Sequence, residues 1–116
     1  MVSSPVNRMF RAFSDPTRLR ILHLLAGGEL CVGDLVTVLN VPQPTASRHL
    51  AYLRKAGLIS AKKKSYWTFY ALAPARSAFH RKLLECVDTC FRDVPELAKD
   101  SVRMKKLREH GGCCPP

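Results

Sequence analysis

One segment in the middle of the sequence limits the possible folds more than any other part of the chain. It reads VPQPTASRHLAYLRKAGL and covers residues 41–58. Its two prolines predict a turn, because proline disfavours helix in the residue before it. Ala46, Leu50 and Leu53 then recur at helical spacing, and the helix is expected to end at Gly57. The segment therefore predicts a turn followed by a helix with one apolar side and one polar, basic side.

Three further helices are predicted before this turn. The first covers residues 6–13, where apolar residues recur at i, i+3, i+4 and i+7. The second begins after Asp15, whose side chain can cap a helix, with Pro16 at the first helical position. It ends at the glycine pair that follows its apolar residues. The third is short and lies within residues 31–40.

The segment after Gly57 predicts a β-hairpin and then more helix. LISAKKKSYWTFYAL, residues 58–72, has apolar ends, a basic centre and alternating residues, which is typical of two strands joined near residues 62–65. Helical spacing returns after Pro74, and a last basic segment is expected to form another helix. Helices around a tight turn, followed by a basic hairpin, are the plan of a winged helix-turn-helix. The expected fold is mainly α with a small β-hairpin.

Charge and cysteine content indicate the class of partner. Nineteen Lys and Arg against nine Asp and Glu give a net charge of +10 over 116 residues, which is typical of a protein that binds a polyanion. No apolar run approaches the roughly 20 residues that cross a bilayer, and the first residues lack the apolar core of a signal peptide. We therefore expect a cytoplasmic protein with no membrane partner and with reduced thiols. Five cysteines are an odd number for a disulfide framework, so metal, metalloid or redox chemistry is the better fit.

A single DNA-binding and dimerisation domain is expected over residues 1–110, followed by a flexible cysteine-containing tail, residues 111–116. The tail reads GGCCPP. Its glycines let the backbone turn freely, and its prolines keep the end from forming a helix.

The predicted DNA contacts come from the helix after the turn and from the tip of the hairpin. A recognition helix needs polar side chains that reach base edges from its N-terminal half, and lysines at the hairpin tip can meet phosphates. The candidates are Gln43, Pro44, Thr45, Ser47, Arg48, His49, Lys62, Lys63 and Lys64. A lone histidine is often a structural hydrogen-bonding group, and a lysine run is often only a solvated surface.

These segments together resemble the ArsR/SmtB family of metal- and metalloid-responsive repressors. The resemblance runs from about Phe10 to Leu72 and rests on FSDPTRLRILHLL, ELCVGDL, QPTASRHLAYLRKAGLI and SYWTFYAL. Family members are bacterial winged-helix homodimers that stay on operator DNA until an inducer binds. The resemblance implies a repressor, and a dimer interface built from the terminal helices, around Phe10 and in residues 75–92.

The arsenic site that the resemblance implies is incomplete in this chain. The arsenic-responsive branch carries Cys-Val-Cys-Asp-Leu in its third helix, whereas this chain reads CVGDL, with Gly33 two residues after Cys31. Cys31 is therefore a weak candidate ligand, and we expect it to be dispensable for induction. The zinc branch uses Asp-x-His and His-x-x-Glu pairs, and His80, Glu85 and Asp88 do not have that spacing.

Two other cysteine pairs supply the predicted inducer thiolates. Cys86 and Cys90 are four residues apart, which puts both sulfurs on one helical face with Cβ atoms about 6 Å apart. Cys113 and Cys114 are expected to complete their coordination from the tail, because trivalent arsenic prefers three sulfurs and a helix alone gives two. Two alternatives stay open: Cys86 and Cys90 pack in the dimer interface, or the tail thiols are incidental.

The sequence thus predicts a homodimeric repressor that a soft metalloid, As(III), methylarsenite or Sb(III), releases from operator DNA, with no permanent cofactor. The alternative is a repressor of the same fold that senses oxidant or persulfide, where a cation such as Lys82 or Arg92 lowers a thiol pKa. An enzyme is disfavoured, because the sequence has no Cys-x-x-Cys after a strand, no phosphate-binding loop and no paired catalytic carboxylates.

Overall fold

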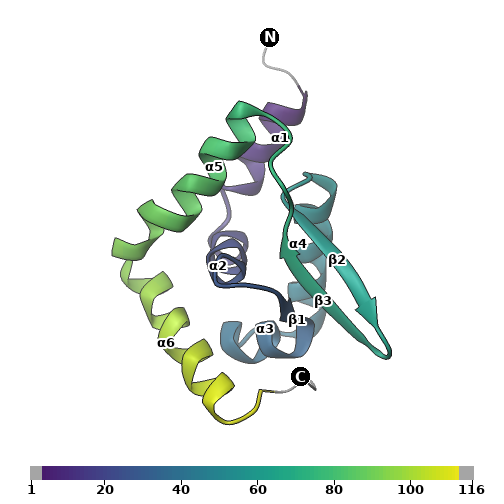
Figure 1. Ribbon diagram of the computed structural model, residues 1–116, viewed down its shortest axis with the longest axis vertical. Coiled ribbons are helices and arrows are strands. Elements are labelled where there is room, and N and C mark those ends of the chain that lie inside the picture. The colour runs from purple at the N-terminus through teal and green to yellow at the C-terminus, as the bar shows by residue number, and fades with distance from the viewer. Residues whose placement is uncertain (1–3, 113–116) are drawn as a thin grey trace.

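Local sequence signals set the ends of the helices in a computed structural model of the chain, which describes residues 4–112 (Figure 1). The helices are α1 Ser4–Ala12, α2 Pro16–Leu25, α3 Val32–Leu39, α4 Gln43–Lys55, α5 Ala78–Thr89 and α6 Pro95–Glu109, with the short 3₁₀ helix η1 Cys90–Asp93 after α5. The Asp15 carboxylate caps α2 by accepting a hydrogen bond from the Arg18 backbone N–H at 3.0 Å. Asn40 ends α3 in the left-handed conformation, with φ of 53°. The helices predicted around the turn are confirmed.

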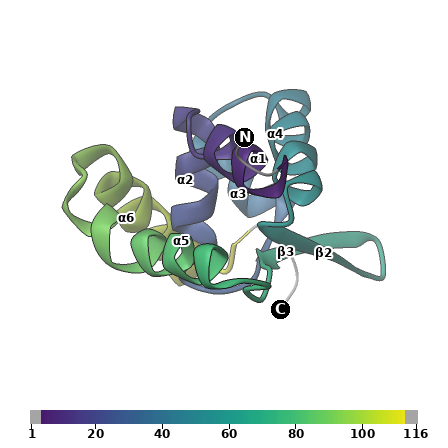
Figure 2. The same ribbon diagram turned by 90° about the horizontal axis from the view of Figure 1, so that it is seen from above.

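The strands are β1 Leu30–Cys31, β2 Ile59–Lys64 and β3 Trp67–Leu72. Within residues 4–112 they form a three-stranded antiparallel sheet in the order β1-β3-β2. The predicted hairpin is β2–β3, and it extends beyond the helices as a wing (Figure 2). β1 pairs with the other edge of β3, with Leu30 opposite Tyr70. That third strand was not predicted.

Helix α2 lies at the centre of the molecule, between α3, α4 and the C-terminal helices (Figure 1). The largest buried aliphatic side chains come from α2, α3, α4 and the residue before β2: Ile21, Leu22, Leu35, Leu50, Leu53 and Leu58. Burying each such side chain contributes about 1.5–3 kcal/mol relative to leaving it exposed. The apolar side of α4 is thus fixed against the core, and its polar side faces outward.

Helices α5 and α6 run along one side of the molecule (Figure 1). α5 starts at Ala78 because Ser77 caps it, with Ser77 Oγ accepting from the His80 N–H at 3.1 Å. The chain from Pro74 to Ser77 is not helical, so the predicted start, directly after the proline, is a few residues early. Within residues 4–112 no helix combines the length and apolar character needed to cross a membrane.

The division into residues 1–110 and a flexible tail stays a prediction. Helix α6 ends at Glu109, close to the predicted boundary, but residues 113–116 lie outside the described part of the chain.

Candidate nucleic-acid interface and thiol sites

The outward side of α4 carries the predicted base-reading residues. Gln43, Pro44, Ser47 and Arg48 are exposed and Thr45 is half-buried, while Ala46 on the opposite side is fully buried. The helix begins at Gln43 after Pro42, so its first-turn backbone N–H groups and these side chains lie at the same end. A helix N-terminus favours an anionic partner such as phosphate. This end of α4 has the chemistry of a nucleic-acid contact.

His49 is placed differently from the other predicted contacts. Its side chain turns toward the start of α2, where Nδ1 lies 3.5 Å from Arg18 Nη1 and 3.8 Å from Asp15 Oδ2. The Arg18 guanidinium also lies over the Tyr52 ring, 4.2 Å from its centroid. These contacts favour a structural role for His49 in orienting α4 on α2.

The wing presents its three lysines unequally. Lys62 and Lys63 are exposed, whereas Lys64 Nζ pairs with Glu29 Oε1 at 2.8 Å and lies 4.8 Å from the Phe69 ring centroid. Lys64 is therefore partly neutralised and held on the sheet. Lys62 and Lys63 are the lysines of this run that can reach a phosphate without breaking an ion pair.

Two features beside α4 escaped the sequence analysis. Tyr66 at the tip of the wing is 94% exposed, and Arg8 and Arg11 of α1 line a hollow of about 450 Å³ with Tyr52 and Lys55. Arg8 Nη1 donates to the Lys55 carbonyl at 3.3 Å. These arginines extend the basic surface from α4 to α1. Their sequence signal was the basic side of α1, but only the packing of α1 on α4 brings them together.

The α5 thiols lie where the helix ends. Cys86 is half-buried and Cys90 is exposed, both are free, and the Cys90 N–H donates to the Cys86 carbonyl. Burial raises the pKa of the Cys86 thiol, and the neighbouring Cys90 thiol raises it further through a hydrogen bond and its charge. The predicted placement of both sulfurs at one position of the helix stands as a pair of thiols in mutual contact.

The other predicted thiols are not brought to this pair in the described structure. Cys113 and Cys114 lie outside the described residues, so the four-cysteine coordination stays a prediction. Cys31 is 1% exposed and precedes α3, and its side chain makes no capping hydrogen bond. Among residues 4–112, no three His, Cys, Asp or Glu side chains are grouped so that they could hold a metal ion.

His80 is a structural residue rather than a ligand. Its side chain is fully buried, and Nδ1 accepts a hydrogen bond from the Arg76 backbone N–H at 3.2 Å. Burial, with a smaller effect of the Arg76 charge, lowers the pKa of its imidazole. The ring is therefore held neutral inside the fold.

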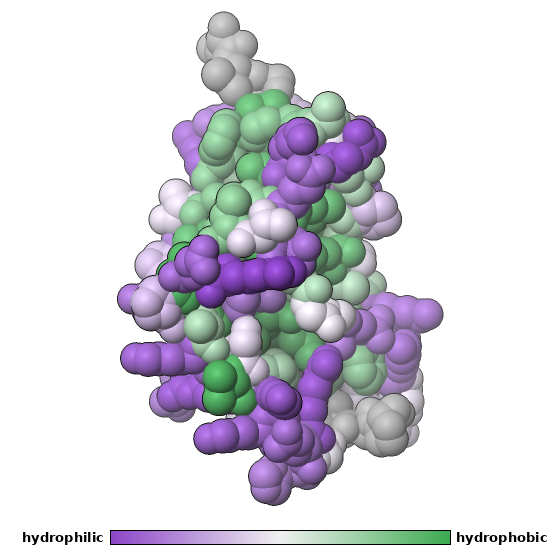
Figure 3. All heavy atoms as spheres, turned by 60° about the vertical axis from the view of Figure 1, so that its left-hand side comes forward, coloured by the Kyte–Doolittle hydropathy of each residue, from purple (hydrophilic) through white to green (hydrophobic). Residues whose placement is uncertain are grey.

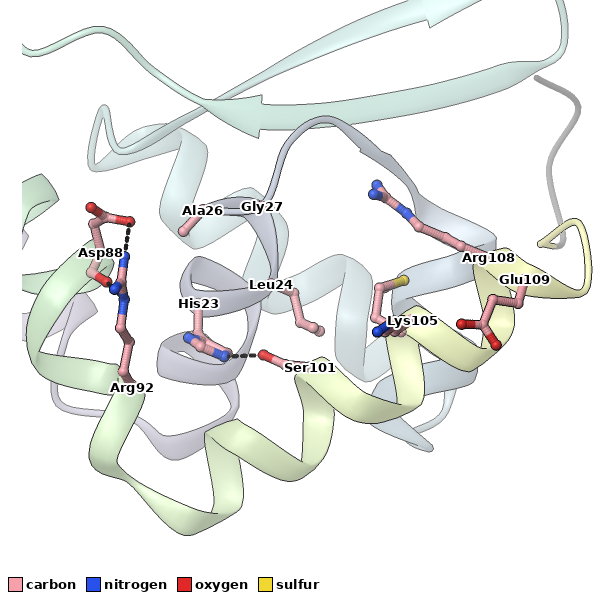
Figure 4. Close-up of a pocket in the computed structure, with 11 residues that line it drawn as sticks. His23, Leu24, Ala26, Gly27, Asp88, Arg92, Ser101, Lys105, Arg108 and Glu109 are labelled. Carbon is pink, nitrogen blue, oxygen red and sulfur yellow. Dashed lines mark hydrogen bonds and ion pairs between the residues drawn. The ribbon is translucent and has the colours of Figure 1, made fainter.

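A hollow of about 650 Å³ separates α2 from the C-terminal helices (Figure 4). His23 Nε2 contacts Ser101 Oγ at 2.6 Å on its floor, and Arg92 pairs with Asp88 at 3.6 Å on one side. None of the predicted DNA or thiol residues lines it. The hollow thus stands apart from both candidate sites.

The N-terminal and C-terminal helices share an exposed apolar face. Phe10 of α1 is 55% exposed, and its ring meets that of Phe79 of α5 edge-on at 5.1 Å between centroids. Leu83 and Cys86 on α5 are only half-buried. Figure 3 shows apolar residues gathered at the level of α1 and the first half of α5, with hydrophilic residues concentrated lower, around α6.

Comparison with known proteins places this geometry in a family. The model of the bacterial regulatory protein arsR family matches residues 15–61. An uncharacterized HTH-type transcriptional regulator from Methanocaldococcus jannaschii is 44% identical over 69% of this chain and 88% of its own length. The arsenical resistance operon repressor of Escherichia coli is 44% identical over 67% of this chain and 68% of its own.

Among solved structures, a homodimeric winged helix-turn-helix DNA-binding domain from Mycobacterium bovis is similar to this fold. It has a TM-score of 0.60 and 30% identity, covering 84% of this chain and 82% of its own. The winged helix-turn-helix fold is confirmed. The chain belongs to the ArsR family of bacterial regulatory proteins, and it is a DNA-binding transcriptional repressor rather than an enzyme.

Proposed function

We propose that the protein is a homodimeric repressor that holds operator DNA through two α4 helices and two wings, and that a soft metalloid releases it by binding cysteine thiolates. The observation that carries the DNA-binding part is the exposed, polar start of α4, with Gln43, Ser47 and Arg48, on a chain whose wing exposes Lys62 and Lys63. The start of a recognition helix reads base edges in the major groove, and lysines at its margin meet the backbone.

The exposed face of α1 and α5 supports the dimer. Phe10 and Phe79 form an aromatic pair that is open to solvent in the single chain, and such apolar patches mark interaction sites. The Mycobacterium bovis relative is homodimeric. In a two-fold dimer, two copies of α4 read half-sites about one helical turn of DNA apart, so the operator should be a pseudo-palindrome.

The thiol pair on α5 supports the inducer. Cys86 and Cys90 lie beside this face, so an ion bound there adds to or disturbs the packing between subunits. Soft thiolates select trivalent arsenic or antimony over hard cations, and the Escherichia coli relative is an arsenical resistance repressor. To release DNA, the ion must bind the DNA-incompetent dimer more tightly than the competent one.

The redox alternative has less support at this pair. A redox-sensing cysteine needs a lowered pKa, so that the thiolate is present at neutral pH. The pKa of Cys86 is raised instead, by burial and by Cys90. Metalloid binding tolerates this, because the ion displaces the thiol protons as it binds.

The test starts from operator fragments selected from genomic DNA with the reduced protein. Sedimentation of the complex should give two chains per fragment. Arsenite or methylarsenite should release the DNA under fully reducing conditions, whereas zinc should not. Release only by oxidant, reversed by dithiothreitol, would replace the metalloid function with redox sensing.

A further inference from the structure

The described chain ends against the start of α3. Gly111 and Gly112 adopt positive φ angles of 92° and 69°, and the Gly112 N–H donates to the Leu107 carbonyl at 2.9 Å. A Cβ atom on Gly112 would lie 3.2 Å from both carboxylate oxygens of Asp34. Arg108 Nη2 also donates to the Glu29 carbonyl at 3.4 Å. The turn after α6 therefore directs the C-terminus onto the first turn of α3.

Cys31 lies at that place. It is the residue directly before α3, three positions ahead of Asp34, and it is 1% exposed. Cys31 is disulfide-bonded, and its partner is not Cys86 or Cys90, which are both free. The remaining cysteines of the chain are Cys113 and Cys114.

The length of chain beyond Gly112 limits what the tail can reach. Consecutive Cα atoms are about 3.8 Å apart, so the two tail cysteines lie within about 4 and 8 Å of the Gly112 Cα. The α5 thiols lie beyond the opposite end of α6, a 15-residue helix about 22 Å long. Figure 1 shows this separation: the end of α6 lies below α3, and the junction of α5 with α6 lies far to the left.

We infer that the C-terminal pair docks on its own subunit at the start of α3, where Cys31, Cys113 and Cys114 form a three-thiol site for a trivalent metalloid. This inference rests on the proposed function for the class of ion, and it replaces the expectation that the tail joins Cys86 and Cys90 and that Cys31 is dispensable. The tail supplies the sulfurs that the sequence lacks at Gly33.

The chemistry of the site balances with a thiol reductant. Two electrons and two protons from a dithiol open the Cys31 disulfide to free thiols. Arsenous acid then forms three As–S bonds with the three cysteines and releases three molecules of water. The bound ion ties the end of α6 to α3, the helix that directly precedes α4.

The first test maps which cysteines meet, because trypsin puts the three groups on separate peptides: residues 21–48, 83–92 and 109–116. The folded, full-length protein is oxidised with diamide and digested without reduction. The inference predicts a disulfide between peptides 21–48 and 109–116. A link between 83–92 and 109–116, or no link to 21–48, would overturn it.

The second test measures arsenite bound to the reduced protein by equilibrium dialysis. Cys113→Ser/Cys114→Ser and Cys31→Ala should each lose the same tightly bound arsenic, and combining them should remove no more. Cys86→Ser/Cys90→Ser is the matched control and should retain it. If Cys31→Ala binds arsenite like the wild type while the tail variant does not, the tail works with other thiols and the site is wrong. The tail variant, which alters no buried residue in the described structure, decides the case if Cys31→Ala fails to fold.

Failure of the proposed function is distinguishable from failure of this site. If arsenite binds the three cysteines but the wild-type protein stays on operator DNA, the site stands and metalloid-induced release is wrong. If DNA is released equally from wild type and from both variants, release stands and the site is wrong.

Discussion

Arg20 of α2 and Asp100 of α6 form an ion pair with 2.7 Å between Nε and Oδ2 and 3.0 Å between Nη2 and Oδ1. Asp100 is 2% exposed, and its hydrogen bond is the main reason why the pKa of Arg20 is raised. Arg20 Nη2 also donates to the Leu39 carbonyl at 3.2 Å. One guanidinium therefore joins α2, the end of α3 and α6, which fixes the C-terminal helix beside the helix-turn-helix.

Replacing Asp100 with Ala should lower the free energy of unfolding by about 3 kcal/mol, because it leaves Arg20 desolvated without its partner. We choose the lower end of the usual range since the Arg20 side chain is 24% exposed. The measurement is urea unfolding. Asp93→Ala, at an exposed position, is the control and should change stability by no more than about 0.5 kcal/mol. Equal effects of the two substitutions would contradict the role of the pair.

The sequence predicted the elements whose signals are local. Asp15 with Pro16 marks the start of α2, and the prolines before Thr45 mark the turn before α4, so these helices could be placed without tertiary structure. β1 could not, because two residues become a strand only when Leu30 meets Tyr70 across the sheet.

The same distinction applies to the sites. The exposure of Arg48 follows from the helical period, whereas the engagement of Lys64 by Glu29 and of His49 by Asp15 depends on contacts between distant segments. The meeting of Gly112 with Asp34 is also long-range. Sequence spacing alone therefore paired the tail with the wrong region of the chain, if the α3 site is correct.

Arg48→Ala should weaken binding to the selected operator by about 1–3 kcal/mol, because an arginine that reads a base loses its paired hydrogen bonds. Binding to unrelated DNA should fall much less. Fluorescence anisotropy with the two DNA fragments gives both values. Unchanged operator affinity would remove Arg48 from the reading surface.

Lys63→Ala should weaken binding to all DNA sequences alike and reduce the dependence of log K on log salt by about one unit, because it removes one phosphate contact. Lys64→Ala is the matched variant in the same strand. Since Lys64 is already paired with Glu29, its loss should reduce the salt dependence less. A larger effect at Lys64 would show that the wing meets DNA in a different orientation.

Stability should fall as the pH drops below about 6.5. Burial lowers the pKa of His80 and of His23 from the ordinary value of 6.5, so the unfolded chain binds protons that the folded chain does not. Their contribution is complete above the unfolded pKa and is lost as the pH falls toward the folded pKa. Urea unfolding between pH 7.5 and 5.5 measures this, and a free energy of unfolding that is flat or rises toward pH 5.5 would contradict it.

The central claim is that thiols couple a soft metalloid to release from DNA. The most direct measurement is the occupancy of a labelled operator fragment by the fully reduced protein as arsenite is added, compared with a variant in which all five cysteines are serine. The account predicts that arsenite empties the operator for the wild type and leaves the serine variant bound with its full affinity. Release of both proteins at the same arsenite concentration, or of neither, would contradict it.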